Sequence, residues 1–206
     1  VRIATYNVEW FSNLFAEDGS LLNDSGWSGR HDVTRRDQLA ALGKVFRVLD
    51  ADAVMVIEAP ESNRRRSGTE ALENFAAHFG LRTNKSLMGF DNHTQQEICL
   101  LYDPNQLSAR HDPVGDVIGK KGSAQSPRFD GVFRIDLDID ATEDLVRWSK
   151  PPLEAALETR DGTHLRLIGV HAKSKAPHGA RGEAEIMRLS IANRRKQLAQ
   201  CLWLRK

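Results

Sequence analysis

The sequence predicts an α+β fold in which two packed, mixed β-sheets are flanked by helices. The first 80 residues read as strand, helix, buried strand and helix, and most of the remainder reads as antiparallel strands. The first strand is not followed by a glycine-rich turn, which argues against a Rossmann fold. The 206 residues can form one sizeable core, and no linker or repeat divides them, so we expect a single domain.

The first quarter of the chain supplies a strand, a loop, a helix and a second strand. Residues 1–9 read as a strand, and residues 12–33, rich in Ser, Gly, Asn and Asp, read as a long loop. Thr34 is a suitable helix cap. Apolar residues then follow at helical spacings of three and four: Leu39, Leu42, Phe46 and Leu49. The unbroken apolar run 53–57 predicts a strand buried on both faces.

A basic loop and a second helix come next. The loop, ESNRRRSG, covers residues 61–68. Residues 69–79 carry apolar side chains on one helical face, with Gly80 as the stop. Residues 97–102 then read as a strand that ends at Asp-Pro-Asn.

The second half of the chain is predicted to hold a further strand, a hairpin and a helix. Apolar and charged residues alternate over 129–139, which indicates a strand with one wet face. Residues 153–159 and 163–171 flank an Arg-Asp-Gly turn and predict a hairpin. The final helix is expected over 183–204. Four of its apolar residues are expected to face inward: Met187, Ile191, Leu198 and Leu202.

Composition limits the possible partners. The formal net charge is +1, so any contact with nucleic acid has to come from a local patch. No apolar run approaches the roughly 20 residues of a membrane helix, and no signal peptide is visible. Cys99 and Cys201 lie in apolar stretches and are expected to be two buried thiols rather than a disulfide.

Three polar residues interrupt or end apolar strands: Asn7, Glu58 and His171. Taken singly, each is more simply explained as a structural or solvated side chain. Taken together they suggest chemistry, because strand ends bring site residues together on a rigid frame. A carboxylate suits Mg²⁺, an amide can bind a metal-bound water or a phosphate oxygen, and a histidine can donate to a leaving group. This set fits a metal-assisted phosphoester hydrolase.

Five segments extend this interpretation by resemblance. ATYNVEWF, AVMVIEAPES, ICLLYDPNQL, WSKPPLEA and LIGVHAKSK resemble, in this order, motifs of the endonuclease/exonuclease/phosphatase superfamily, the deoxyribonuclease-I-like hydrolases. The resemblance implies a four-layer α/β/β/α sandwich. It also implies water attack on a phosphoester, with Mg²⁺ as the cofactor and Mn²⁺ or Ca²⁺ as alternatives.

The same resemblance implies roles for individual residues. Glu58 would bind the metal, and Asn7 would lie beside it and orient water or phosphate. His171 would contact the scissile phosphate. Lys150 and Lys173 are candidate phosphate contacts, although plain surface charge explains these two lysines equally well.

The substrate stays open in this interpretation. Arg64 and Arg65 follow the Glu58 strand, and together with the basic residues after His171 they favour a nucleic-acid backbone. A solvated basic face is the simpler alternative. Relatives with this scaffold also cleave phosphoinositides and sphingomyelin. A rival from another class is a binding module that kept the fold and lost the chemistry.

The sequence also departs from the family pattern. The family's Gly-Asp-x-Asn and Ser-Asp-His segments are absent, and TQQE at 94–97 replaces an Arg-Gly-x-Asp-like stretch. We therefore expect a fragment that lacks the C-terminal third of the domain, and with it the general base. The complete protein is expected to be a monomer without a membrane span. The chain starts at Val1 without a methionine, which leaves localisation open between cytoplasmic and secreted.

Overall fold

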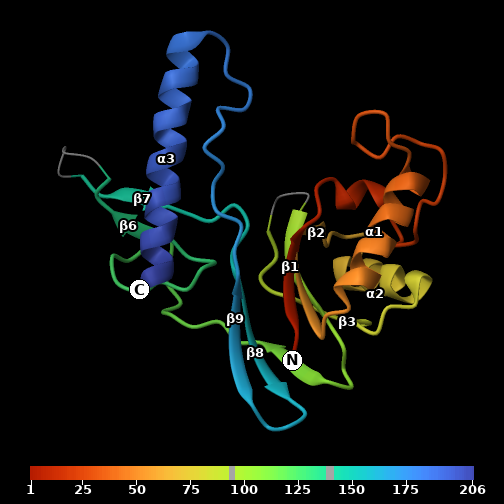
Figure 1. The fold of residues 1–206 in the computed structure, drawn as a ribbon. Helices are drawn as coiled ribbons and strands as arrows, with labels where there is room; N and C mark the ends of the chain where they lie inside the picture. The colour runs from red at the N-terminus through yellow and green to blue at the C-terminus, as the bar shows by residue number, and fades with distance from the viewer. Residues whose placement is uncertain (93–95, 138–141) are drawn as a thin grey trace. The chain divides into compact units, whose positions relative to one another are not determined.

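The computed structural model describes residues 1–92, 96–137 and 142–206. The chain divides into two compact units (Figure 1). The first unit combines residues 1–112 with 150–170, and the second combines 113–149 with 171–206. The expectation of a single domain stays a prediction.

A four-stranded mixed sheet forms the centre of the first unit, with the strand order β1-β2-β4-β3. β1 (Ile3–Asn7) runs parallel to β2 (Ala53–Pro60). β4 (Gln96–Tyr102) pairs antiparallel with both β2 and β3 (Lys85–Met88). The apolar run in β2 is buried throughout, which confirms the prediction of a strand covered on both faces.

A second sheet packs against the first within the same unit. It is antiparallel and has the order β5 (Leu107–His111), β8 (Leu153–Thr159), β9 (His164–Gly169). Buried side chains of both sheets form one shared core: Ala53, Met55, Ile57, Ile98 and Leu100 from the first, and Leu107, Leu153, Ala155 and Leu157 from the second. The two packed sheets and the hairpin are therefore confirmed.

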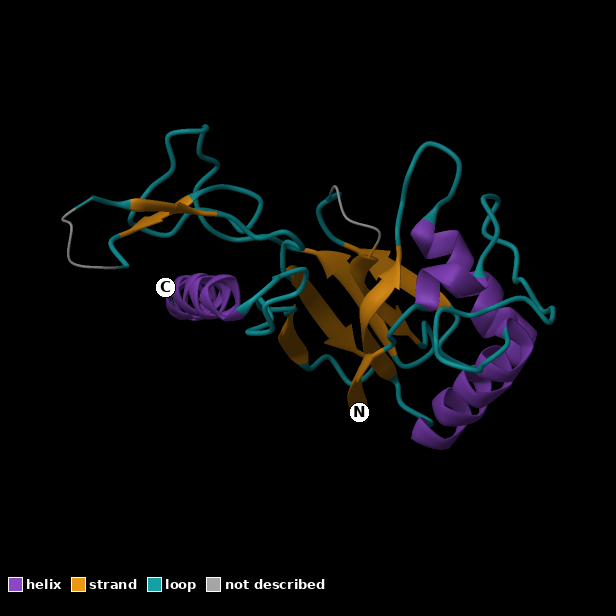
Figure 2. Ribbon diagram, turned by 90° about the horizontal axis from the view of Figure 1, so that it is seen from above, coloured by secondary structure: helices purple, strands orange, loops and turns teal. Residues whose placement is uncertain are grey.

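Two helices cover the other face of the four-stranded sheet (Figure 2). α1 (Arg35–Leu49) begins after Thr34, whose hydroxyl accepts a hydrogen bond from the Asp37 amide at 3.1 Å. α2 (Gly68–Phe79) ends at Gly80 in the left-handed conformation, φ 61°. The described layers of this unit are thus helix, sheet and sheet. The fourth layer stays a prediction.

The second unit is built around an aromatic cluster. Its strands β6 (Phe133–Ile135) and β7 (Asp144–Val146) pair antiparallel, and its helix α3 covers Glu183–Arg205. Four aromatic rings pack together: Phe129, Phe133, Trp148 and Trp203. The indole N–H of Trp203 donates to the Pro127 carbonyl at 2.7 Å, so this buried indole has a partner for its polar group.

The prediction of an inward apolar face on α3 is wrong for three of its four residues, and the fourth, Leu202, is half-buried. Met187, Ile191 and Leu198 are 64%, 45% and 56% exposed. The buried side chains of this helix are Ala199, Gln200 and Trp203. α3 has apolar side chains on more than one face. Near the C-terminal end, the buried face is the one that carries the large indole of Trp203.

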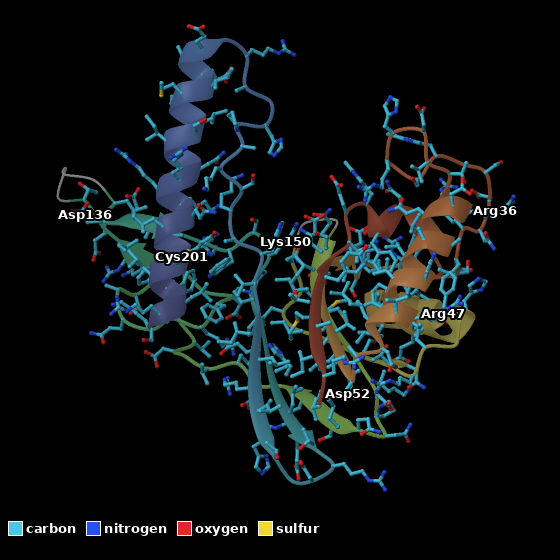
Figure 3. All side chains as sticks on the ribbon, in the orientation of Figure 1. Arg36, Arg47, Asp52, Asp136, Lys150 and Cys201 are labelled. Atoms are coloured by element: carbon cyan, nitrogen blue, oxygen red, sulfur yellow. The ribbon has the colours of Figure 1, made fainter. Side chains whose placement is uncertain are left out.

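Two further expectations need correction. The strand predicted over 129–139 is confined to β6, because a turn closed by the Gly131 amide and the Arg128 carbonyl precedes it; residues 138–139 lie outside the described part of the chain. Cys99 is buried as expected, but Cys201 is exposed on α3 (Figure 3). An apolar sequence neighbourhood does not bury a residue on the solvent side of a helix.

Candidate functional site

A distortion of β2 sets the position of Glu58. The pairing of β2 with β4 shifts between Ile57 and Ala59, so Glu58 is the extra residue of a β-bulge. Its φ is 65°, a left-handed conformation that costs a non-glycine residue on the order of 1–3 kcal/mol. Bulges and strained residues concentrate at functional sites. The end of β2 is therefore the best candidate site in the first unit.

Asn7 lies at the same end of the neighbouring strand. In the parallel pair β1–β2, Asn7 is in register with Ile57, the residue before Glu58. The amide of Val8 donates to the Ile57 carbonyl at 2.8 Å, which extends the pairing by one residue. The end of β1 that carries Asn7 thus lies beside the segment of β2 that carries Glu58.

A glutamine links Glu58 to Lys150. The Nε2 of Gln96 donates to the Oε2 of Glu58 at 2.8 Å, and the Gln96 Oε1 accepts from the Lys150 ammonium. The Lys150 Nζ is also 3.9 Å from the Glu58 Oε1. The side chains of Lys150 and Glu58 are only 11% and 14% exposed. One amide thus holds a largely buried anion and cation in a fixed arrangement (Lys150 is labelled in Figure 3).

Burial perturbs two titratable groups of this cluster. It lowers the pKa of Lys150, while the carboxylates of Glu58 and Glu97 act in the opposite direction. Burial, reinforced by the charge of Asp91, raises the pKa of Glu97 to about 8. Glu97 is 2% exposed and accepts a hydrogen bond from the Asn92 amide. At neutral pH its carboxyl group is therefore mostly protonated.

The oxygen donors at this site suit a hard divalent cation. Mg²⁺ is commonly held by one or two carboxylates and completes its shell with water and substrate oxygens. Glu58 supplies such a carboxylate, and Asn7 supplies an amide oxygen at the adjacent strand end. Across the described residues no group of three or more His, Cys, Asp or Glu is placed to hold a metal ion. The fit therefore requires water and substrate as the remaining ligands.

Comparisons with protein-family models, curated proteins and solved structures found no match. In the described part of the chain, no helix has both the length and the apolarity to cross a bilayer, in agreement with the sequence.

The basic loop after Glu58 contains three arginines with different environments. Arg64 and Arg65 are exposed, and Arg65 forms an ion pair with Glu17 at 2.6 Å. Arg66 is buried. Its guanidinium donates to the carbonyls of Ser12, Phe15 and Glu61 and pairs with the Glu61 carboxylate at 3.0 Å. Arg66 is therefore structural, and only the first two can reach a ligand.

The remaining predicted site residues belong to the second unit. His171 comes two residues after the end of β9. The backbone amide of Lys173 donates to the Gln200 side chain at 2.7 Å. The structure thus groups Asn7, Glu58 and Lys150 in one unit, and a place for His171 and Lys173 in the same site stays a prediction.

Sequence reasoning missed Gln96 and Glu97. Both lie in the TQQE stretch, where the sequence by itself shows only a departure from the family motif. Gln96 is two residues before the buried Ile98 in β4, so strand alternation places both on the same face. That alternation was the available signal, although it does not reveal the contact with Lys150, 54 residues away.

Proposed function

We propose that the protein is a divalent-metal-dependent phosphodiester hydrolase of the endonuclease/exonuclease/phosphatase type. The observation that carries the proposal is the strained Glu58, held by Gln96 beside Lys150 at the strand end next to Asn7. A cation next to a metal-type carboxylate suits an anionic substrate whose charge grows during reaction. The five family-like segments support the same conclusion.

Each residue of the site would have its own role in the proposed hydrolysis. Glu58, with Asn7 beside it, would hold Mg²⁺, which when bound polarises a phosphate oxygen and offsets its charge. Gln96 would fix the Glu58 carboxylate by its 2.8 Å hydrogen bond. Lys150, already largely buried, would donate to a non-bridging phosphate oxygen with little loss of solvation at the moment of reaction. His171 would donate to the scissile phosphate or the leaving oxygen.

One observation favours a second candidate, a module that binds phosphoesters without cleaving them. Among the described residues, Glu58 is not accompanied by a three-member cluster of His, Cys, Asp or Glu. Lys150 and Asn7 would still bind a phosphate group in such a module. The two candidates differ in whether bound metal leads to turnover.

Hydrolysis of bis(p-nitrophenyl) phosphate by the full-length protein, with Mg²⁺ or Mn²⁺ titrated, tests the proposal. Binding of Mn²⁺ measured by calorimetry gives a second readout. We expect Glu58→Gln to lower turnover at least about 100-fold and to weaken Mn²⁺ binding at least tenfold, because it removes the charge that holds a hard cation. The matched control Glu158→Gln changes an exposed carboxylate on β8 and should change neither.

The outcomes separate the two candidates. Metal-dependent turnover that Glu58→Gln leaves intact would refute the assigned site. Binding of the diester without any turnover would refute the hydrolase and support the binding module.

A further inference from the structure

Charge is distributed very unevenly along the chain. Residues 171–206 contain nine Lys or Arg and two Asp or Glu, a formal net charge of +7. Residues 1–170 contain twenty Lys or Arg and twenty-six Asp or Glu, a formal net charge of −6. Such asymmetry is typical of chains that bind polyanions. The site around Glu58 does not account for it.

Helix α3 carries five of these nine basic residues. Its two carboxylates, Glu183 and Glu185, lie in the first turn, where the helix dipole favours them. From Ile186 to Lys206 the sequence has no acidic residue. Four exposed arginines lie along the helix: Arg188, Arg194, Arg195 and Arg205. The positive charge therefore extends along one rigid element.

The segment between β9 and α3, which Figure 1 shows as the connection into the helix, contains Lys173. It is held along the helix by two hydrogen bonds, from the Lys173 amide to Gln200 at 2.7 Å and from the Asn193 side chain to the Ala176 carbonyl at 2.9 Å. Lys173 thereby comes close enough to Lys196 to lower its pKa, in addition to the larger effect of burial. Neighbouring ammonium groups repel each other, and a bound anion would reduce that repulsion.

We propose that Lys173, Lys196 and the arginines of α3 form a binding surface for the phosphate backbone of nucleic acid. The 23 residues of α3 span about 35 Å, which matches a row of phosphates rather than a single anionic group. The inference deepens the proposed hydrolase by naming its substrate class, and it rests on that function.

The arrangement of α3 argues against an anionic membrane as the partner. A helix that lies in a bilayer surface separates its apolar face from its basic face. On α3, Arg194 lies three residues after Ile191 and four before Leu198, so it shares their helical face, and all three are exposed. Inserting this face into lipid would bury a guanidinium.

Fluorescence anisotropy with a labelled 20-base-pair duplex, in EDTA and at 50 to 200 mM salt, tests the inference. We expect Lys173→Gln/Lys196→Gln to weaken binding at least tenfold at 100 mM salt. The slope of log K against log salt should fall by about 1.8, at roughly 0.9 per phosphate contact. Arg188→Gln/Arg194→Gln, which changes only exposed side chains, should act in the same way and keeps the test valid if the lysine variant unfolds. The control Arg36→Gln/Lys44→Gln removes two exposed charges from α1 (Arg36 is labelled in Figure 3) and should leave binding unchanged.

Several results would overturn the inference: no binding by the wild-type protein at 50 mM salt, an equal loss in the α1 control, or tighter binding to phosphatidylserine vesicles than to the duplex at the same salt. Because EDTA removes the metal, binding is measured independently of hydrolysis. Duplex binding without turnover of the small diester would support this surface while refuting the hydrolase. Turnover of the diester without duplex binding would support the hydrolase while refuting this surface.

Discussion

The buried carboxyl group of Glu97 should make the stability of the first unit depend on pH. Burial and the charge of Asp91 raise its pKa from 4.5 to about 8, and its side chain is 2% exposed. Folding therefore takes up a proton at any pH between these two values. The isosteric change Glu97→Gln keeps the shape and the neutral state while removing the titration.

The sign and size of this pH dependence follow from the difference between the pKa of Glu97 in the folded and the unfolded protein. Below pH 4.5 the carboxyl group is protonated in both states and has no effect on the pH dependence. As pH rises towards 8, the unfolded chain releases its proton freely, and the folded protein loses about 1.4 kcal/mol of stability per pH unit. Over the full interval the loss is on the order of 5 kcal/mol, an upper bound because the neighbouring charges respond as well. The stability that this group contributes is therefore present in acid and is lost as the pH rises to about 8.

Urea denaturation at pH 5, 6, 7 and 8, followed by far-ultraviolet circular dichroism, measures this effect. The free energy of unfolding of Glu97→Gln, minus that of the wild type, should grow with pH and favour the variant at pH 8. The exposed control Glu158→Gln should parallel the wild type at every pH. A difference between Glu97→Gln and the wild type that stays constant from pH 5 to 8 would refute the argument that Glu97 is protonated by burial.

Three further changes test the packing. Arg66→Met should lower the free energy of unfolding by about 3–5 kcal/mol, because it leaves Glu61 without its buried partner; exposed Arg64→Met should change it by less than about 0.5 kcal/mol, and similar losses in urea melts would contradict the structural role of Arg66. Gly43→Ala should destabilise by about 1–3 kcal/mol despite the helix preference of alanine, since the new Cβ would lie 2.2 Å from Phe79; a higher melting temperature would contradict this. Ellman's reagent should titrate Cys201 in the native protein and Cys99 only after denaturation, because Cys99 is buried and burial raises the pKa of its thiol; two rapidly reacting thiols would be incompatible with the fold.

The first-unit helices and the strand β2 were predictable because their signals are local. Thr34 caps α1 and Gly80 ends α2 through hydrogen bonds within a few residues, so neither depends on the rest of the fold. The apolar run of β2 similarly requires only that two layers cover it. Short strands such as β3 and β7 carry no comparable local signal and were missed.

The site was predictable in part. Asn7 and Glu58 were expected at strand ends, and the parallel register of β1 and β2 brings these ends together. The bulge that turns Glu58 out of the ladder depends on the register with β4, which is a property of two strands and not of either sequence alone. The bridge through Gln96 depends in addition on Lys150, which arrives from a distant segment. The same limit applies to Arg66, since three consecutive arginines give no indication of which one turns inward.

Helix α3 shows what periodicity can and cannot determine. The spacing of Met187, Ile191 and Leu198 correctly indicates that they share one face, but it cannot indicate whether another element covers that face. Burial is decided by partners elsewhere in the chain, and here Phe129, Phe133 and Trp148 pack around Trp203 on a different face. The sequence did contain a warning, because Arg194 interrupts the apolar row on that face. An arginine among the apolar residues makes the face a poor core surface, and the same residue supports its assignment to a charged partner.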